Sequence, residues 1–493
     1  MCFYFSRGCK SLPEKSYRVD RFFIFVFMNK DRFFQSFPDE RLIKRGNKIL
    51  QDLFRSSVRS IRQFSLTSAD AKGAYRFLQN RRISESAIIK NLQNNCIESC
   101  KDKYVVCIQD TSDINLSSHS ERINHDEFIG TTNAKNTTGL GFLIHPSLVL
   151  DAQTGVPFGY SAVKIWNRPS EFKNKHERQY NKLPIEEKES YKWIETSKET
   201  KNSLENVVKG MLIIQDREGD IYEQFAIIPN QKTDLLVRAS SNRTLFDKTK
   251  LFSCLDNQIV QGSYEVLIES NSKTKRKKRI AKLDIRFREV ELKRTTTANK
   301  NTPKTIKLYL IEAKEVDYNG KDKICWRLLT SIKVESLEMA MSCIEWYSWR
   351  WTIEEVFKIL KKEGFDIEAS ELEYAASVRK LCLMIIEVVI KLFLMRLAYN
   401  EPELDINANT CFNEEEIACL ENQIKRLEGK TDKQKNQYAK NDLKRYVWCI
   451  ARMGGWKGYE KERKPGITTL WIGLKNFKAL MEGWSLHKDV STR

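Results

Sequence analysis

Two apolar segments that each end in an aspartate constrain the fold of this chain most. KYVVCIQD ends at Asp110 and MLIIQD ends at Asp216, and both are typical of short buried strands. Between them, GFLIHPSLVLDAQTGVPFGYSAVKIW predicts two strands joined through the turn DAQTG, and EEKESYKWIETSKE predicts a polar helix. This order of strand, hairpin, helix and strand predicts a mixed α/β core. Acids at the carboxyl ends of such strands mark the edge where these folds build a site.

The segments before and after this core have different patterns. Residues 38–63, SADAKGAYRFLQN and ISESAIIKNLQNN have helical periodicity, and Ser84 is the expected N-cap of the last of these helices. Within residues 250–335 we expect four more strands, in YEVLIES, KLDIRFREVEL, TIKLYLIEAKEV and CWRLLTS. From about residue 334 the pattern is helical to the end of the chain.

The charge balance favours a polyanionic partner. Lys and Arg total 84 against 65 Asp and Glu, a formal charge of +19, and nucleic acid is the simplest partner for such an excess. The 12 cysteines show no metal-finger spacing, which favours reduced thiols in a cytosol. RFFIFVFM is too short to cross a bilayer, and the apolar run at residues 381–395 is interrupted by Glu387 and Lys391. We therefore expect no membrane association.

The stretch WYSWRWTIEEVFKILKK, residues 346–362, predicts one continuous helix with an unusual polar face. At about 100° per residue, five side chains fall within an arc of roughly 80°: Tyr347, Arg350, Glu354, Lys358 and Lys361. Two of its three tryptophans join the apolar stripe, but Trp351 lies beside the charged arc, where water would reach it unless a ligand covers it. The alternative is a solvated face with ion pairs between neighbouring turns.

Glu354 needs partners if it serves catalysis. Hydrolysis of phosphodiesters uses carboxylates that hold two divalent metal ions, and the strand-end acids Asp110 and Asp216 are the candidates to complete such a set. Taken singly, these aspartates, like Asp113 and Asp220, are equally compatible with capping or turn roles.

These motifs together resemble the DDE transposases of bacterial insertion sequences, in the branch with the YREK signature. Tyr347, Arg350, Glu354 and Lys361 reproduce the spacing of that signature. DREGD at residues 216–220 resembles the second family motif, and the first acid stands in the expected Asp-Thr-Ser context. The resemblance continues in GAYRFLQN, in HPSLVLDA, in WRLLTS and in ARMGGW, and it covers nearly all of the chain after Met28.

The resemblance implies a ribonuclease-H-like core interrupted by a β-strand insertion. It implies cut-and-paste transposition, in which one strand is nicked at the element end, the freed 3′-hydroxyl forms a hairpin, and the reopened end joins target DNA. Asp110, Asp216 and Glu354 would be the catalytic residues and would hold two Mg²⁺ or Mn²⁺ ions.

The resemblance also assigns contacts to DNA. Trp326 would stack on a base flipped out of the hairpin, and Trp351 would fill the gap that the base leaves. A packed strand residue is the alternative for Trp326. The remaining DNA-contact residues are Arg76, Arg217, Arg238, Tyr347, Arg350, Lys358 and Lys361.

The domain prediction follows from these patterns and from the resemblance. We expect residues 1–27 to be a non-native or disordered extension, with Met28 as the natural start, and residues 28–95 to be a helical DNA-binding domain. The catalytic domain would span residues 96–396 with its insertion at about 240–335, and residues 397–493 would form a helical domain for dimerisation and DNA contact. The partners implied are element ends, target DNA and a second protomer in a synaptic complex. The expected location is the bacterial cytoplasm, associated with the nucleoid.

Two other functions share parts of this pattern. A ribonuclease-H-like nuclease without strand transfer needs the three acids but not Trp326 or Trp351. A non-catalytic DNA-binding protein needs the positive charge but not the acids.

Overall fold

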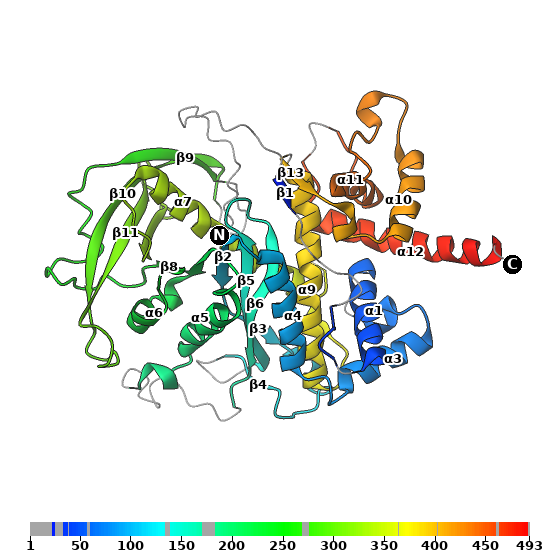
Figure 1. The fold of residues 1–493 in the computed structure, drawn as a ribbon, viewed down its shortest axis with the longest axis horizontal. Helices are drawn as coiled ribbons and strands as arrows, with labels where there is room; N and C mark the ends of the chain where they lie inside the picture. The colour runs from blue at the N-terminus through cyan, green and yellow to red at the C-terminus, as the bar shows by residue number, and fades with distance from the viewer. Residues whose placement is uncertain are drawn as a thin grey trace.

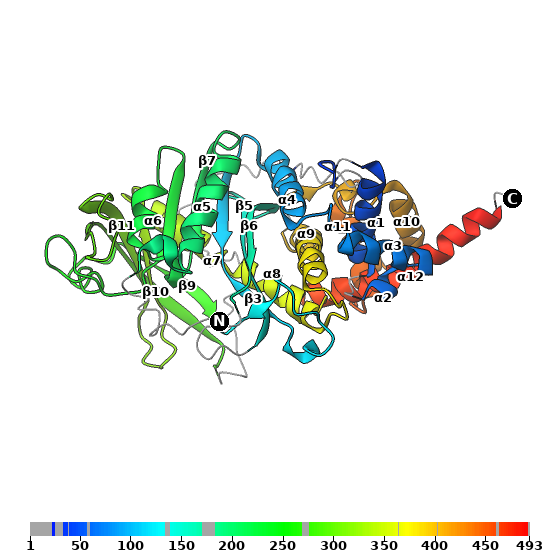
Figure 2. The same cartoon turned by 90° about the horizontal axis from the view of Figure 1, so that it is seen from below.

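A central sheet and one long buried helix organise the molecule (Figure 1). The computed structural model describes residues 22–24, 33–37, 39–56, 60–133, 139–169, 183–268, 276–362, 364–401, 403–459 and 463–491. The sheet lies on one side of helix α9 (Ala375–Asn400), and helices from both ends of the chain lie on the other side, as Figure 2 also shows.

Five strands form the core of the sheet. They are β2 (Tyr104–Gln109), β5 (Leu140–Asp151), β6 (Pro157–Trp166), β7 (Gly210–Gln215) and β8 (Thr233–Arg238). Their spatial order is β6, β5, β2, β7, β8, with β5 antiparallel to β2 and β6, and with β2, β7 and β8 parallel. This is the ribonuclease-H-like arrangement, so the predicted fold class is confirmed.

Two short strands continue the edge of the core. After β2, the chain passes Asp110 and Thr111 and then forms β3 (Ser112–Asn115), which also pairs with β5. Strand β4 (Gly130–Thr131) pairs with the beginning of β5. Asp110 therefore lies at the interruption between two strands that share the neighbour β5.

The β insertion extends the same sheet. Its antiparallel strands are β9 (Gly262–Ile268), β10 (Arg279–Lys293), β11 (Thr305–Glu315) and β12 (Cys325–Thr330). Strand β12 pairs antiparallel with β8, so core and insertion form one eleven-stranded sheet. The four strands lie where the sequence predicted them.

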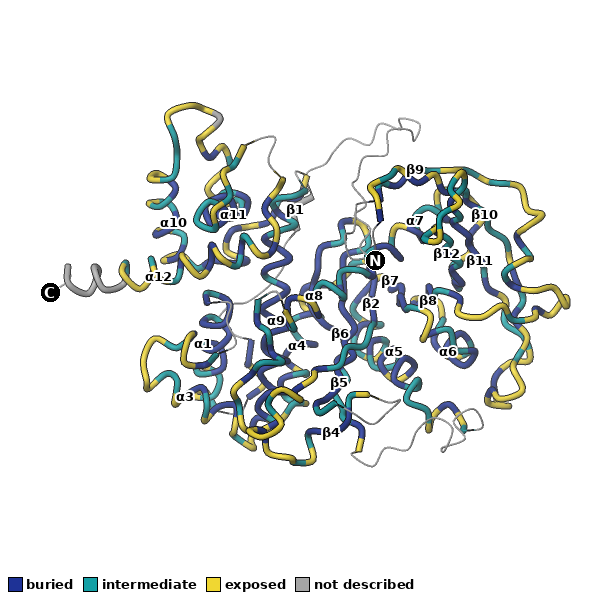
Figure 3. Tube along the Cα trace, turned by 180° about the vertical axis from the view of Figure 1, so that it is seen from behind, coloured by how far each residue is buried: buried dark blue, intermediate teal, exposed yellow. Residues whose placement is uncertain are grey.

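Helices α4 (Glu85–Cys100) and α5 (Tyr191–Leu204) pack on β6, and α6 (Tyr222–Ile227) follows β7. Ser84 caps α4 by accepting a hydrogen bond from the Ala87 amide, as predicted. Helix α9 packs against α4 and β6, and most of its side chains are buried, as the dark blue trace in Figure 3 shows. No helix in the described ranges has the length and apolar character needed to cross a membrane.

The helical regions at the two ends of the chain pack on each other as well as on α9. The N-terminal region contains α1 (Glu40–Ser56), α2 (Ile61–Phe64) and α3 (Ser68–Gln79), and the C-terminal region contains α10 (Glu414–Leu427), α11 (Leu443–Met453) and α12 (Ile467–Ser491). Arg55 pairs with Glu416 at 2.8 Å, and Lys478 donates to the carbonyl oxygens of Gln63 and Phe64. Both regions are helical as expected, but the sequence did not predict that they are in contact.

A short part of the N-terminal segment forms a strand. Strand β1 (Phe22–Ile24), inside the segment expected to be a disordered extension, pairs in parallel with β13 (Leu404–Ile406). The pairing gives the backbone of this apolar segment hydrogen-bond partners. The other residues of the 1–27 segment, and Met28, lie outside the described residues.

Candidate functional site

The two strand-end aspartates are adjacent because β2 and β7 are parallel neighbours. Ile108 pairs with Ile214, and each strand continues for one glutamine before its aspartate. Asp110 and Asp216 thus leave the same edge of the sheet at the same register. Asp216 then caps the short helix η4 (Arg217–Gly219) by accepting a hydrogen bond from the Glu218 amide at 2.8 Å.

A buried amide network joins the two strand ends directly behind the aspartates. Gln215 Nε2 donates to Gln109 Oε1 at 2.8 Å and to Ser197 Oγ of α5 at 3.1 Å. Gln224 of α6 donates to the same hydroxyl at 2.9 Å, and all four side chains are buried. Because buried polar groups are costly when unpaired, this network fixes the spacing of the residues that follow it. The repeated Ile-Gln-Asp that ends both strands was a sequence signal for this network, and it was overlooked.

The prediction of one helix over residues 346–362 is wrong. Helix α7 (Leu337–Ser348) ends one residue before the second tryptophan, and α8 (Trp351–Lys361) begins three residues after that end. Between them, the amides of Arg350, Thr352 and Ile353 bond to carbonyl oxygens three residues back, which tightens the turn. Tyr347 belongs to the last turn of α7, and its side chain is buried.

Arg350 lies between two of the three acids. Its Nη1 donates to Asp110 Oδ2 at 3.0 Å, and its Nη2 donates to Glu354 Oε1 at 2.5 Å. The guanidinium is itself buried and brings together side chains that lie 240 residues apart in sequence. We call Asp110, Asp216 and Glu354 the acid corner.

The pKa of Asp110 is raised to about 7. Burial is the main cause, and the neighbouring carboxylates of Asp216 and Glu354 add to the rise, whereas Arg350 opposes it. Within the described ranges, no three His, Cys, Asp or Glu side chains are arranged as a ready metal-binding group. The guanidinium of Arg350 stands between Asp110 and Glu354 instead.

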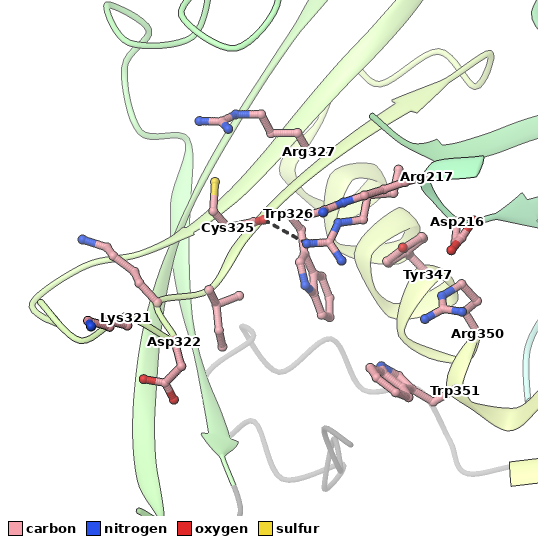
Figure 4. Close-up of a pocket in the computed structure, with 13 residues that line it drawn as sticks. Asp216, Arg217, Lys321, Asp322, Cys325, Trp326, Arg327, Tyr347, Arg350 and Trp351 are labelled. Atoms are coloured by element: carbon pink, nitrogen blue, oxygen red, sulfur yellow. Dashed lines mark hydrogen bonds between the residues drawn. The ribbon is translucent and has the colours of Figure 1, made fainter. Parts of the chain in front are cut away.

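A pocket of about 630 Å³ opens beside the acid corner (Figure 4). Strand β12 brings Trp326 to it, because Leu328 pairs with Arg238 at the end of β8. The Trp326 and Tyr347 rings meet edge to face at 5.6 Å. We call this cavity the Trp326 pocket, and six predicted DNA-contact residues line it: Arg217, Arg238, Trp326, Tyr347, Arg350 and Trp351.

Two of these side chains are less accessible than the sequence suggested. Tyr347 is buried, and burial raises its pKa while Arg350 and Arg238 oppose the rise. Trp326 lines the pocket but is only 5% exposed, so most of the indole packs against other residues. Most of the Trp326 side chain is therefore packed, as the alternative interpretation of a packed strand residue predicted.

Three predicted contacts lie outside the pocket. Lys361 pairs with Asp113 at 3.1 Å and with Glu368 at 3.2 Å. Lys358 is exposed on α8, and Arg76 is exposed on α3. The structure thus gathers six of the nine predicted contact residues at one cavity and leaves three elsewhere.

Comparison with known proteins supports a role in DNA transposition. Residues 34–83, which include α1, α2 and α3, match the family described as transposase DNA-binding. A solved structure, the piggyBac transposase synaptic complex with hairpin DNA, aligns with 92% of this chain and 77% of that chain, at 8% identity and a TM-score of 0.37. This structural similarity is too low to assign a function to the chain. The match of residues 34–83 supports a transposase that binds DNA.

Proposed function

We propose that this protein is a DDE transposase of the YREK branch from a bacterial insertion sequence. The observation that carries the proposal is that Asp110, Asp216 and Glu354 lie close together at the edge of a ribonuclease-H-like sheet, with Arg350 paired to Asp110 and Glu354. The transposase DNA-binding match in the same chain adds independent support.

The chemistry of the acid corner fits divalent metal ions. Carboxylate oxygens are the ligands that Mg²⁺ and Mn²⁺ prefer. Burial, with smaller contributions from the carboxylates of Asp216 and Glu354, raises the pKa of Asp110, and a bound cation would favour its charged form. Asp110, Asp216 and Glu354 would hold two such ions. When bound, the ions would activate a water molecule or a 3′-hydroxyl and stabilise the entering and leaving oxygens of phosphodiester displacement.

The Trp326 pocket would hold an unpaired nucleotide next to this chemistry. Its aromatic side chains offer a surface on which a base can stack, and its arginines can bind the adjoining phosphates. Arg350 lines the pocket and also contacts two acids, so a phosphate bound there would lie beside the acid corner. This arrangement suits a hairpin intermediate, in which a strained DNA end must be held open.

The helical regions would supply binding and assembly. Helices α1 to α3 would bind the terminal inverted repeats, and Arg76 would contact the element end. The C-terminal helices α10 to α12 would contact a second protomer, so that two DNA ends and two proteins form the synaptic complex. Such a protein would act on DNA in the bacterial cytoplasm, at the nucleoid.

The test uses purified protein, duplex DNA made from the terminal repeats that flank the coding sequence, and Mg²⁺ or Mn²⁺. Denaturing gels should show nicked strands, hairpin ends and joined products. Glu354→Gln keeps the size of the side chain but removes its charge, and it should abolish all three products without loss of DNA binding. Nicks alone would indicate a nuclease without strand transfer. Binding without any metal-dependent product would indicate a non-catalytic protein.

A further inference from the structure

The loop between β11 and β12, residues 316–324, forms one wall of the Trp326 pocket (Figure 4). It contributes Lys321 and Lys323, and both side chains are exposed. Among the residues that the structure describes, none pairs with either ammonium group. No pattern in the sequence of this loop predicted a role for it.

The loop is held in place by Arg279, the first residue of β10. Its guanidinium binds Glu315 through two hydrogen bonds of 2.9 and 3.1 Å, and it binds Asp322 at 3.0 Å. Glu315 is almost fully buried and also accepts a hydrogen bond from the Ile324 amide at 2.8 Å. One arginine thus fixes the beginning, the middle and the end of the loop.

Tyr318 adds a second restraint. Its ring stacks on the Arg279 guanidinium at 3.8 Å, and its hydroxyl donates to Asp322 Oδ1 at 2.5 Å. The ring passes so close to Gly320 that a Cβ there would overlap the Tyr318 hydroxyl. These contacts tie down Asp322, whereas its neighbours Lys321 and Lys323 remain directed to solvent at the pocket.

The charges around the pocket indicate what this wall can bind. The cationic lining residues are Arg217, Arg238, Lys321, Lys323, Arg327 and Arg350, and the acidic ones are Asp216 and Asp322. Asp322 is already paired with Arg279, and Arg327 with Glu312, so the lysine pair adds uncompensated positive charge at the pocket. A DNA backbone supplies phosphates at the spacing of successive nucleotides, with a base that can turn toward Trp326.

We propose that residues 316–324 form a preorganised phosphate clamp, in which Lys321 and Lys323 hold the backbone of the DNA strand whose unpaired base enters the Trp326 pocket. The proposal rests on the proposed function and adds a binding element to it. A rigid loop loses little conformational freedom when it binds, which favours a clamp over a flexible lysine-rich tip.

The experiment compares Lys321→Ala/Lys323→Ala with a matched control, Lys101→Ala/Lys209→Ala. The control lysines are exposed and lie just before β2 and β7, at the strand ends opposite to the aspartates. The probes are a fluorescein-labelled duplex of the flanking terminal repeat and the same duplex closed by a hairpin with unpaired bases. Binding is measured by anisotropy over a series of salt concentrations.

The clamp variant should bind the hairpin probe on the order of 10-fold more weakly at moderate salt, and its slope of log affinity against log salt should fall by about 1 to 2. The control variant should match the wild type. Tyr318→Phe keeps both lysines but loosens Asp322, and it should lose part of the preference for the hairpin probe. Clamp and control variants with equal affinity and equal slopes would overturn the proposal.

The same samples separate the clamp from the proposed function. If the wild type makes no cleavage product but the clamp variant still loses hairpin affinity and salt slope, the clamp holds and the transposase proposal fails. If products form and the lysines have no effect on binding, the clamp fails alone. A wild type that binds neither probe would overturn both.

Discussion

The acid corner and the Trp326 pocket adjoin each other, yet their charges are arranged in opposite ways. In the acid corner three carboxylates lie together, one buried guanidinium pairs with two of them, and burial raises the pKa of Asp110 to about 7. In the pocket cations outnumber acids, and two lysines are left without a partner among the described residues. A phosphate would be attracted to the pocket and repelled by the acid corner. Arg350 belongs to both, so it decides how closely a phosphate can approach the acids.

The largest effect should come from neutralising the acid corner itself. Asp110→Asn keeps the shape of the side chain but removes the charge that would hold metal, so we expect product formation to fall by at least about 10³-fold. DNA affinity should stay near that of the wild type, because Asp110 does not line the pocket. Rates are measured from denaturing gels. An active Asp110→Asn protein would remove the acid corner from the mechanism.

Glu387 is a buried acid outside the acid corner, and its pKa is raised like that of Asp110. Burial in α9 raises its pKa from 4.5 to about 7, opposed by Lys391 and by a hydrogen bond from Asn95. The folded state therefore binds this proton more tightly than the unfolded state, and the stabilisation present below pH 4.5 is lost as pH rises through 7. Glu387→Gln should remove this loss and raise the free energy of unfolding at pH 8 by about 3 kcal/mol.

Urea denaturation at pH 5 and pH 8 checks this prediction. The variant should gain more stability relative to the wild type at pH 8 than at pH 5, and its cleavage rate should be unchanged. An equal effect at both values of pH would show that the carboxyl is not protonated in the folded protein at neutral pH. A change in cleavage rate would show that Glu387 affects catalysis although it lies outside the acid corner. A raised pKa would then not be enough to tell an acid of the site from an acid of the core.

The local parts of the structure were predictable from the sequence. The strands that end in Asp110 and Asp216, the N-cap at Ser84 and the β insertion follow from periodicity and capping chemistry, which act over a few residues. The grouping of Glu354 and Arg350 with Asp110 came from the resemblance, since no pattern within 17 residues encodes the contact between Arg350 and Asp110, which lie 240 positions apart.

The errors arose where tertiary packing overrides local pattern. Residues 346–362 keep helical periodicity, but buried contacts of Tyr347 and Arg350 favour a tight turn between two helices. The clamp loop was missed because its order depends on Arg279, which lies about 40 residues earlier on another strand. Charge counts alone would have described Lys321 and Lys323 as ordinary surface lysines.

The amide network behind the acid corner should matter for both stability and chemistry. Gln215→Leu removes the shorter of the two hydrogen bonds to the buried Gln109 Oε1 and leaves only the 3.4 Å contact from the Ser197 hydroxyl, which should cost about 2 kcal/mol of unfolding free energy. Gln224→Leu is the matched control, because Gln224 reaches the same Ser197 hydroxyl but does not adjoin a residue of the acid corner. Both variants should lose stability, but only Gln215→Leu should also slow cleavage. Equal cleavage rates in the two variants would make the network purely structural.

The smallest effect concerns Arg350, which connects the two regions. Its ion pairs with Asp110 and Glu354 compete with any cation that those carboxylates would bind. Arg350→Gln should therefore increase Mn²⁺ affinity by about 10-fold, the value of one charge-assisted hydrogen bond of about 1.4 kcal/mol, while hairpin DNA binds more weakly. Mn²⁺ affinity is measured by electron paramagnetic resonance without DNA.

Lys361→Gln is the control, since Lys361 lies on the same helix but pairs with Asp113 and Glu368 outside the acid corner. In the wild type, Mn²⁺ affinity should rise with pH through about 7, because the Asp110 carboxyl must lose its proton before it can bind the ion. Unchanged affinity in Arg350→Gln would mean that the guanidinium and the ion do not compete. The acid corner and the pocket would then act independently. A phosphate that binds Arg350 in the pocket would not free Asp110 and Glu354 to bind a metal ion.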